Sequence, residues 1–129
     1  MGLIAGVLAA GAAYVVNLVA SRFVGRYSVV FVAPLVEEFL KTYLAVFLRG
    51  DIVLSHTAFG VAEGVWDYFN AGKKANARSA ALSVITHGLL GYGTFKACAY
   101  VDIIYAVALA ALMHSVWNII MMGGKRLVD

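Results

Sequence analysis

Residues 27–48 read YSVVFVAPLVEEFLKTYLAVFL, an apolar run that carries two glutamates and a lysine near its middle. As a helix, the run is long enough to cross the roughly 30 Å hydrocarbon core of a bilayer, which takes about 17–25 residues. A charge at that depth costs roughly 2.5–3.5 kcal/mol on insertion scales and usually marks function. Glu37, Glu38 and Lys41 therefore predict a membrane helix with a polar site inside the bilayer.

The composition of the whole chain agrees with this prediction. Of its 129 residues, 63% are hydrophobic and only 13% are charged, against about half and a quarter in soluble domains. We expect a single domain over residues 1–129, in contact with a lipid bilayer. The net charge of +3 does not indicate nucleic-acid binding, because most lysines and arginines lie in short breaks between apolar runs.

Four further apolar runs have a similar length. With the first, they predict five transmembrane helices, at residues 3–20, 27–48, 52–69, 79–95 and 103–122. Helices are expected because the bilayer offers no water to an open backbone and the alternation of barrel strands is missing. The N-terminal run is expected to be a span and not a signal peptide, since it lacks a basic start. The predicted fold class is an all-α, polytopic membrane bundle.

The charges between the predicted spans indicate an orientation. If the five spans alternate, Arg49 and Lys96 share one side of the membrane. The other side has the larger group, which consists of Arg22, Arg26, Lys73, Lys74, Arg78, Lys125 and Arg126. Because cytoplasmic loops carry the excess of Lys and Arg, we expect the N-terminus outside and the C-terminus in the cytoplasm.

Three other predicted spans also carry ionisable residues near their middle, namely Glu63, His87 and His114. Glu37 and Lys41 lie four residues apart on one helix face, in the order that favours an ion pair. Glu38 points about 100° away from Glu37. His114 shares a face with Asn118, also four residues on. We expect these groups to line one inward-facing polar cavity.

Each of these features also has a purely structural interpretation. A Glu37–Lys41 pair could merely lower the insertion cost, and membrane histidines often form hydrogen bonds between helices. These interpretations leave Glu38 and Glu63 unexplained, whereas a shared cavity explains the whole set. Elsewhere, we expect His56 at the membrane interface without a role, and Asn17 in an isolated interhelical hydrogen bond. We expect Trp117 to pack beside the site.

Four short motifs occur in order, one in each predicted helix from the second to the fifth. They are EExxK (Glu37, Glu38, Lys41), FxxxE (Phe59, Glu63), a histidine (His87) and HxxxN (His114, Asn118). In this order they resemble the motifs of PrsW-type intramembrane proteases. The wider superfamily includes the CAAX prenyl proteases and bacteriocin-processing enzymes, which typically show EExxxR and FxxxH. The lysine and the second-motif glutamate favour the PrsW branch.

The resemblance implies an intramembrane endopeptidase in a prokaryotic cell membrane that cleaves a membrane-anchored protein, such as an anti-sigma factor. In this interpretation Glu37 is the base that activates water, and Glu38 orients it or shares its proton. Lys41 balances the local charge. His114 and Asn118 stabilise the oxyanion, because both can donate hydrogen bonds to developing negative charge.

The same residues allow metal-assisted chemistry. Glu63, His87 and His114, with Glu37 or Glu38, offer the mixed nitrogen and oxygen ligands that catalytic Zn²⁺ prefers, with a position left for water. Two glutamates and two histidines exceed what a metal-free base requires, which slightly favours the metal version. The residues leave both mechanisms open.

Two other classes of function compete with the protease. The chain is short, which favours a non-catalytic scaffold or binding subunit of the same fold. Buried glutamates, lysine and histidines could also relay protons in a small transporter. The Gly- and Ala-rich first run could pack against the core or against a second copy, so a homo-oligomer is also considered.

Overall fold

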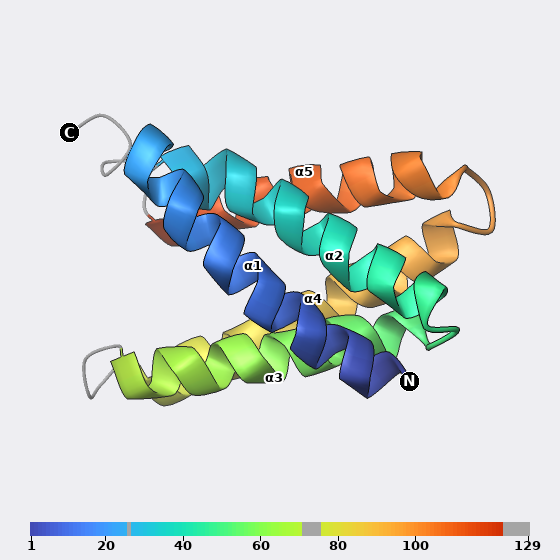
Figure 1. Ribbon diagram of the computed structural model, residues 1–129, viewed down its shortest axis with the longest axis horizontal. Helices are drawn as coiled ribbons and strands as arrows, with labels where there is room; N and C mark the ends of the chain where they lie inside the picture. The colour runs from blue at the N-terminus through green and yellow to red at the C-terminus, as the bar shows by residue number, and fades with distance from the viewer. Residues whose placement is uncertain (26, 71–75, 123–129) are drawn as a thin grey trace.

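The computed structural model describes residues 1–25, 27–70 and 76–122, and these residues form five α-helices and no strand (Figure 1). The helices are α1 (Gly2–Val24), α2 (Ala33–Phe47), α3 (Ile52–Asn70), α4 (Asn76–Ala97) and α5 (Ile103–Met122). A short π-helix, η1 (Ser28–Val32), leads directly into α2. The all-α class is confirmed, and each predicted run coincides with a helix.

Local sequence explains how the second and third helices begin. Pro34 has no N–H to donate to the carbonyl of Val30, and the backbone before α2 has π-helical geometry. The predicted run 27–48 is therefore divided into η1 and α2. At the start of α3, Asp51 Oδ1 accepts a hydrogen bond from the Leu54 N–H at 2.7 Å, which satisfies one of the free donors of the first turn.

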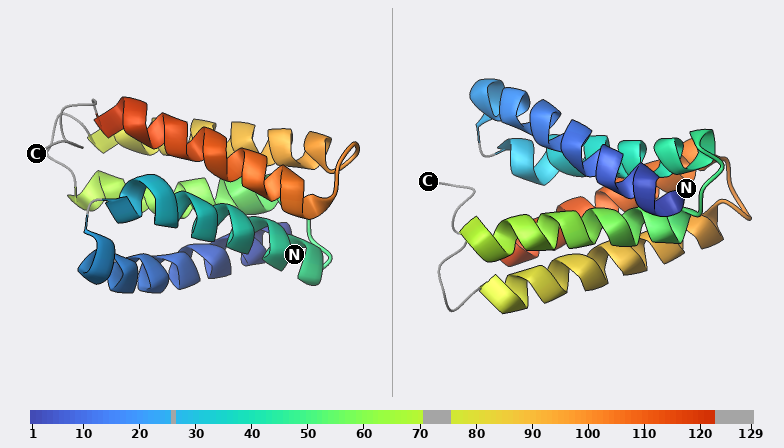
Figure 2. Two further views of the ribbon diagram at one scale, coloured as in Figure 1. Left: turned by 90° about the horizontal axis from the view of Figure 1, so that it is seen from above. Right: turned by 60° about the horizontal axis from the view of Figure 1, so that its bottom comes forward.

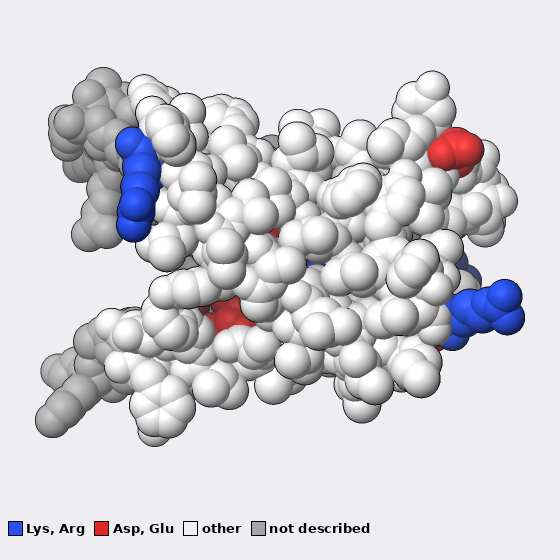
Figure 3. Space-filling model, viewed as in Figure 1, with Lys and Arg blue, Asp and Glu red and all other residues white. Residues whose placement is uncertain are grey.

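Polar and apolar side chains are distributed in the opposite way to those of a soluble protein. The largest fully buried side chains include Lys41, His56, His87 and Glu38. Large apolar side chains on every helix face outward, among them Phe23, Phe47, Phe69, Leu89 and Leu112. The face in Figure 3 accordingly carries few charged atoms. An exposed apolar surface of this extent indicates contact with something other than water.

Two of the helices, α1 and α5, are long and apolar enough to cross a membrane by their length and composition. The other three are shorter or carry more polar residues. Association with a membrane therefore rests on these two helices and on the apolar surface. Five spans remain a prediction.

The helices form two groups that separate toward one end of the molecule. The α3 and α4 helices run antiparallel, side by side, while α2 lies between α1 and α5 (Figures 1 and 2). At the N-terminus of α1 the groups are in close contact: a Cβ added to Gly6 would lie 2.2 Å from the carbonyl oxygen of Ser55. Toward the C-terminus of α1 the two groups diverge (Figure 1).

Small residues also bring α3 and α4 together where the site lies. A Cβ on Gly60 would lie 2.9 Å from the Cβ of His87, and one on Gly64 would lie 2.8 Å from the carbonyl oxygen of Ala80. Glycine allows helix backbones to approach this closely. His87 can therefore reach across α3 toward α2.

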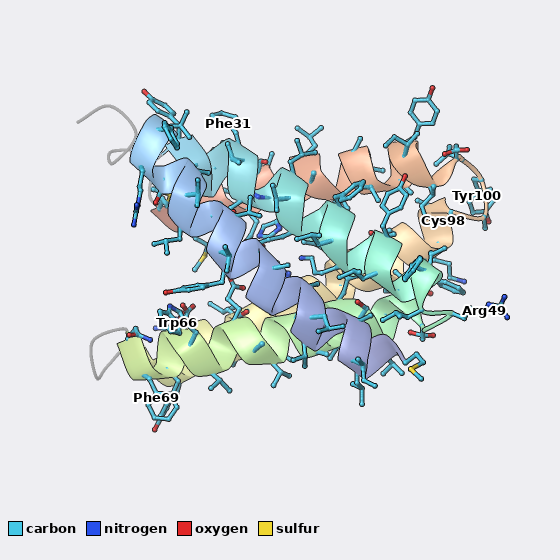
Figure 4. The ribbon with its side chains drawn as sticks, in the orientation of Figure 1. Phe31, Arg49, Trp66, Phe69, Cys98 and Tyr100 are labelled. Atoms are coloured by element: carbon cyan, nitrogen blue, oxygen red, sulfur yellow. The ribbon has the colours of Figure 1, made fainter. Side chains whose placement is uncertain are left out.

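The described charges that bear on orientation lie at the two ends of the bundle. Arg22 and Arg78 lie at the diverging end, and Arg49 and Lys96 lie at the opposite end (Figure 1; Arg49 is labelled in Figure 4). The remaining residues of the predicted cytoplasmic group lie outside the described residues: Arg26, Lys73, Lys74, Lys125 and Arg126. The orientation of the termini remains a prediction.

Candidate active site

Glu38 has more polar partners than its neighbour on α2. The residue is 0% exposed. Its Oε1 accepts a hydrogen bond from Lys41 Nζ at 2.5 Å and lies 2.9 Å from His114 Nδ1 of α5. Its Oε2 lies 3.4 Å from Nδ1 of His56 on α3, but neither of these two atoms makes a hydrogen bond within the described residues. Because nitrogens from three helices surround one carboxylate, Glu38 ties α2, α3 and α5 together.

Lys41 pairs with Glu38 and not with Glu37, the partner that the four-residue spacing indicated. Positions three and four residues apart are both neighbours on a helix, so other contacts decide between them. The ammonium also donates to His87 Nδ1 at 3.0 Å and lies 4.4 Å from the centre of the Phe59 ring. These partners on α3 and α4 hold Lys41 on the side of α2 where Glu38 lies.

His87 connects Lys41 to Glu63. An ammonium group can only donate, so Nδ1 accepts and the protonated nitrogen is Nε2, an assignment that follows from the partners. The Nε2–H then donates to Glu63 Oε2 at 2.6 Å, and Ser83 Oγ donates to the same oxygen at 2.8 Å. A chain of hydrogen bonds thus joins Glu63, His87, Lys41, Glu38 and His114.

Glu37 is bonded quite differently from its neighbour. Its Oε1 accepts a hydrogen bond from Asn17 Nδ2 of α1 at 3.0 Å, which confirms that Asn17 makes an interhelical hydrogen bond. Its Oε2 is buried and has no hydrogen-bond partner within the described residues, and His114 Nδ1 lies 4.0 Å away. Buried polar atoms are rarely left unpaired. Glu37 therefore keeps one oxygen available to a ligand.

His114 and Asn118 share one face of α5, as their spacing predicts. The His114 ring lies 5.0 Å from the ring of His87, edge to face. Asn118 Nδ2 donates to the carbonyl oxygen of Val29 in η1 at 2.9 Å, so one of its two amide hydrogens is engaged by backbone. Trp117 lines the same pocket as both residues, beside the site as expected.

The prediction that His56 lies at the membrane interface without a role is wrong. The residue is 0% exposed, and its Nε2 lies 3.1 Å from Thr42 Oγ1 while Nδ1 faces Glu38. The chain break before α3 suggested exposure, but α3 begins at Ile52 and the first turn already packs inside. A signal for this position exists in the sequence: His56 lies seven residues before Glu63, on the same helix face.

Two pockets adjoin these side chains. A cavity of about 600 Å³ is lined by Glu63, His87, His114, Asn118 and, farther out, Asp67, Arg78 and Ser79. A second cavity of about 340 Å³ lies between α1 and α3 and contains Asn17, Glu37 and Glu63. Glu63 lines both, and acidic atoms are visible in the hollow between α1 and α3 in Figure 3. The site is reached from two sides.

The residues of all four motifs therefore meet in one region of the bundle. Comparison with protein-family models, curated proteins and solved structures finds no match. The function of the site must therefore be argued from its own geometry.

One group of side chains in the site has the composition of a metal centre. Oxygen or nitrogen atoms of Glu37, His87 and His114 lie within 4.8 Å of one another. The set differs from the expected one, because Glu37 replaces Glu63, which hydrogen-bonds to His87 instead. Two histidines and a glutamate match a catalytic zinc site in kind. Both nitrogens of His87 are engaged, however, so a metal would displace Lys41 or Glu63 from one of them.

Proposed function

We propose that this protein is an intramembrane endopeptidase, in which Glu37 activates water to hydrolyse a peptide bond of a membrane-anchored protein. The observation that supports this most directly is the buried, unpartnered Oε2 of Glu37. It lies 4.0 Å from His114 Nδ1, and Glu37 lines the smaller pocket, whereas Glu38, whose Oε2 is also unpartnered within the described residues, lines neither pocket. A carboxylate removed from bulk water, with one oxygen free, suits general base catalysis.

The chemical step needs only groups present in the chain. Glu37 Oε2 takes a proton from a water molecule as the water oxygen attacks the carbonyl carbon of the scissile bond. The resulting tetrahedral oxyanion collapses, the carbon–nitrogen bond breaks, and Glu37 returns the proton to the leaving amine. The products are a carboxylic acid and an amine, and the acid then passes its proton to the amine to give a carboxylate and an ammonium group.

The oxyanion needs hydrogen-bond donors, and two residues of α5 can supply them. Glu38 accepts from Nδ1 of His114, so the imidazole is held in orientation and, when protonated, presents Nε2–H to the pocket. Asn118 retains a second amide hydrogen beside its bond to Val29. Fixed donors of this kind are typically worth about 10²–10³ in rate.

The polar pocket favours hydrolysis over proton transport. Its outer wall carries Asp67, Arg78 and Ser79, which would admit water. The hydrogen-bonded chain begins at Glu63 and ends at His114, and both residues line this same pocket. A proton relay across a membrane needs an opening on each side, but both ends of this chain of bonds reach the pocket whose outer wall is formed by Asp67, Arg78 and Ser79.

A zinc-assisted version is the second candidate, and the cluster of Glu37, His87 and His114 favours it. These three residues would hold the ion, which would lower the pKa of a bound water and polarise the carbonyl. Opposing it, Lys41 Nζ lies 3.0 Å from His87 Nδ1, and two cations so close repel each other. The metal-free mechanism is therefore our first choice.

Cleavage of a fluorogenic transmembrane peptide by purified protein in liposomes tests the proposal. We expect the parent protein to cleave the peptide and Glu37→Gln not to cleave it. Asp102→Asn, which changes an exposed cap of α5, should cleave at the parent rate. Proton flux in the same liposomes without cleavage would contradict the endopeptidase and support transport. A peptide that binds but is not cleaved would support the scaffold.

Elemental analysis of the same sample separates the two mechanisms. With the metal-free site, zinc is far below one ion per chain and a chelator leaves the rate unchanged. Stoichiometric zinc that is lost on His114→Ala, together with chelator-sensitive cleavage, would instead establish the metal version.

A further inference from the structure

Asn17 is an amide on a helix that is otherwise apolar where it passes the site. The proposed base, Glu37, uses the N–H of this amide but not its oxygen. Its Nδ2 donates to Glu37 Oε1 at 3.0 Å. Its Oδ1 is buried and has no hydrogen-bond partner within the described residues. An unpaired buried acceptor costs about 1–3 kcal/mol, so a partner for this atom is expected.

The orientation of this amide follows from Glu37. If the amide were turned over, Oδ1 would face a carboxylate oxygen, and two acceptors would oppose each other whenever Glu37 is ionised. Nδ2 therefore faces Glu37 and Oδ1 points elsewhere. The two unpartnered acceptors, Asn17 Oδ1 and Glu37 Oε2, both belong to residues that line the smaller pocket.

The chemistry of this pocket defines what it can hold. Most of its lining is apolar, from residues such as Ala10, Ala13, Phe59 and Ala62, and it contains carboxylates and no lysine or arginine. At its edge Tyr14 of α1 and Trp66 of α3 have ring centres 5.2 Å apart, and Figure 4 shows Trp66 on the side of α3 that faces α1. The occupant should be apolar in its side chains and should supply hydrogen-bond donors.

A stretch of polypeptide in extended conformation meets both requirements. In a transmembrane helix every main-chain N–H is bonded within the helix, but unwinding frees these donors. We propose that Asn17 is a positioning residue that accepts a hydrogen bond from a main-chain N–H of an unwound, apolar substrate segment while its amide N–H holds Glu37. This inference rests on the proposed function and specifies the form in which the substrate binds.

Binding of N-methylated peptides tests this contact independently of cleavage. Trp117→Phe leaves Trp66, at the pocket, as the single tryptophan of the chain, and its emission reports on peptide binding in detergent micelles. A series of apolar peptides, each with one N-methylated main-chain nitrogen, is titrated against the parent protein and the Asn17→Leu and Asn17→Gln variants. Ser21→Ala is the matched control, because Ser21 bonds to its own helix and lies outside the pocket.

We expect methylation at one position to weaken peptide binding about tenfold in the parent protein and in Ser21→Ala. A tenfold change in affinity corresponds to about 1.4 kcal/mol of binding free energy. Asn17→Leu should bind the unmethylated peptide about tenfold more weakly than the parent protein does. Methylation of the sensitive nitrogen should not weaken its binding any further. Asn17→Gln keeps both an amide oxygen and an N–H for Glu37, and should retain the penalty. It keeps the inference testable if Asn17→Leu does not fold.

A methylation penalty that is equal in Asn17→Leu and the parent protein would overturn the inference. A second result would also overturn it: no methylated position weakens binding, and a simple alkylammonium ion displaces the peptide. The occupant of the pocket would then be an amine. If the coupling is found but no peptide is cleaved, the recognition role of Asn17 stands and the endopeptidase fails.

Discussion

The two glutamates at positions 37 and 38 are adjacent in the chain, yet their surroundings differ completely. Around Glu38, Lys41 and His114 approach Oε1 within hydrogen-bonding distance, while the buried Oε2 lies 3.4 Å from His56 Nδ1 without a hydrogen bond, and the residue lines neither pocket. Around Glu37, Asn17 donates one hydrogen bond and the second oxygen faces pocket space. A carboxylate enclosed by the nitrogens of three other side chains stabilises the helix packing, whereas one that lines a pocket can react.

This difference divides the cluster into a structural half and a reactive half. Removing a group from the structural half leaves buried partners unpaired, so the main effect should be on stability. Removing the reactive oxygen leaves packing intact, so the main effect should be on rate. Three substitutions test the division.

Glu37→Gln should have the largest effect. The amide keeps the shape and still accepts from Asn17, but it cannot take a proton from water, so peptide cleavage should fall by about 10²–10⁴-fold. The unfolding free energy should change little. Cleavage at the parent rate would show that another group is the base.

Glu38→Gln should mainly reduce stability. Neutralising this carboxylate leaves the buried ammonium of Lys41 without its counter-charge, which typically costs about 3–5 kcal/mol. Unfolding in mixed micelles by sodium dodecyl sulfate measures the loss. The double variant with Lys41→Met should recover much of it, because neither buried charge remains. Full stability of the single variant would contradict the structural role of Glu38.

Gly91→Ala should have the smallest of the three effects, through His56. An added Cβ would lie 2.5 Å from the His56 Cβ and 2.8 Å from its Cγ, so the imidazole must move away from Glu38. We expect a loss of about 1–3 kcal/mol from overpacking. Gly93→Ala is the matched control on the same helix, because its Cβ would meet nothing within 4 Å. Equal effects of the two would mean that the position of His56 does not matter.

The sequence was informative wherever a signal depends on composition or on helical period. Apolar runs of membrane length predicted each helix, because a helix satisfies the backbone hydrogen bonds of an apolar run within the run itself. Charges inside those runs indicated Glu37, Glu38, Glu63, His87 and His114, since such residues are costly without a function. The helical period correctly grouped His114 with Asn118.

The same signals failed where the answer depends on partners from other helices. The spacing favoured a pair between Glu37 and Lys41, but contacts with His87 and Phe59 direct Lys41 to Glu38. His56 was assigned to the interface from its place near a chain break, although it is fully buried. The pairing of Lys41 could not follow from the residues of one helix, whereas the spacing of His56 from Glu63 on α3 was a signal that the sequence did contain.

By itself, the sequence determined the helices and the set of ionisable residues within their apolar runs. The tertiary structure alone decided which of two adjacent glutamates lines a pocket, and that Asn17 of the first helix contacts it. The physical reason is that helical propensity and hydrophobicity act along the chain, whereas the pairing of buried polar groups depends on how the helices meet.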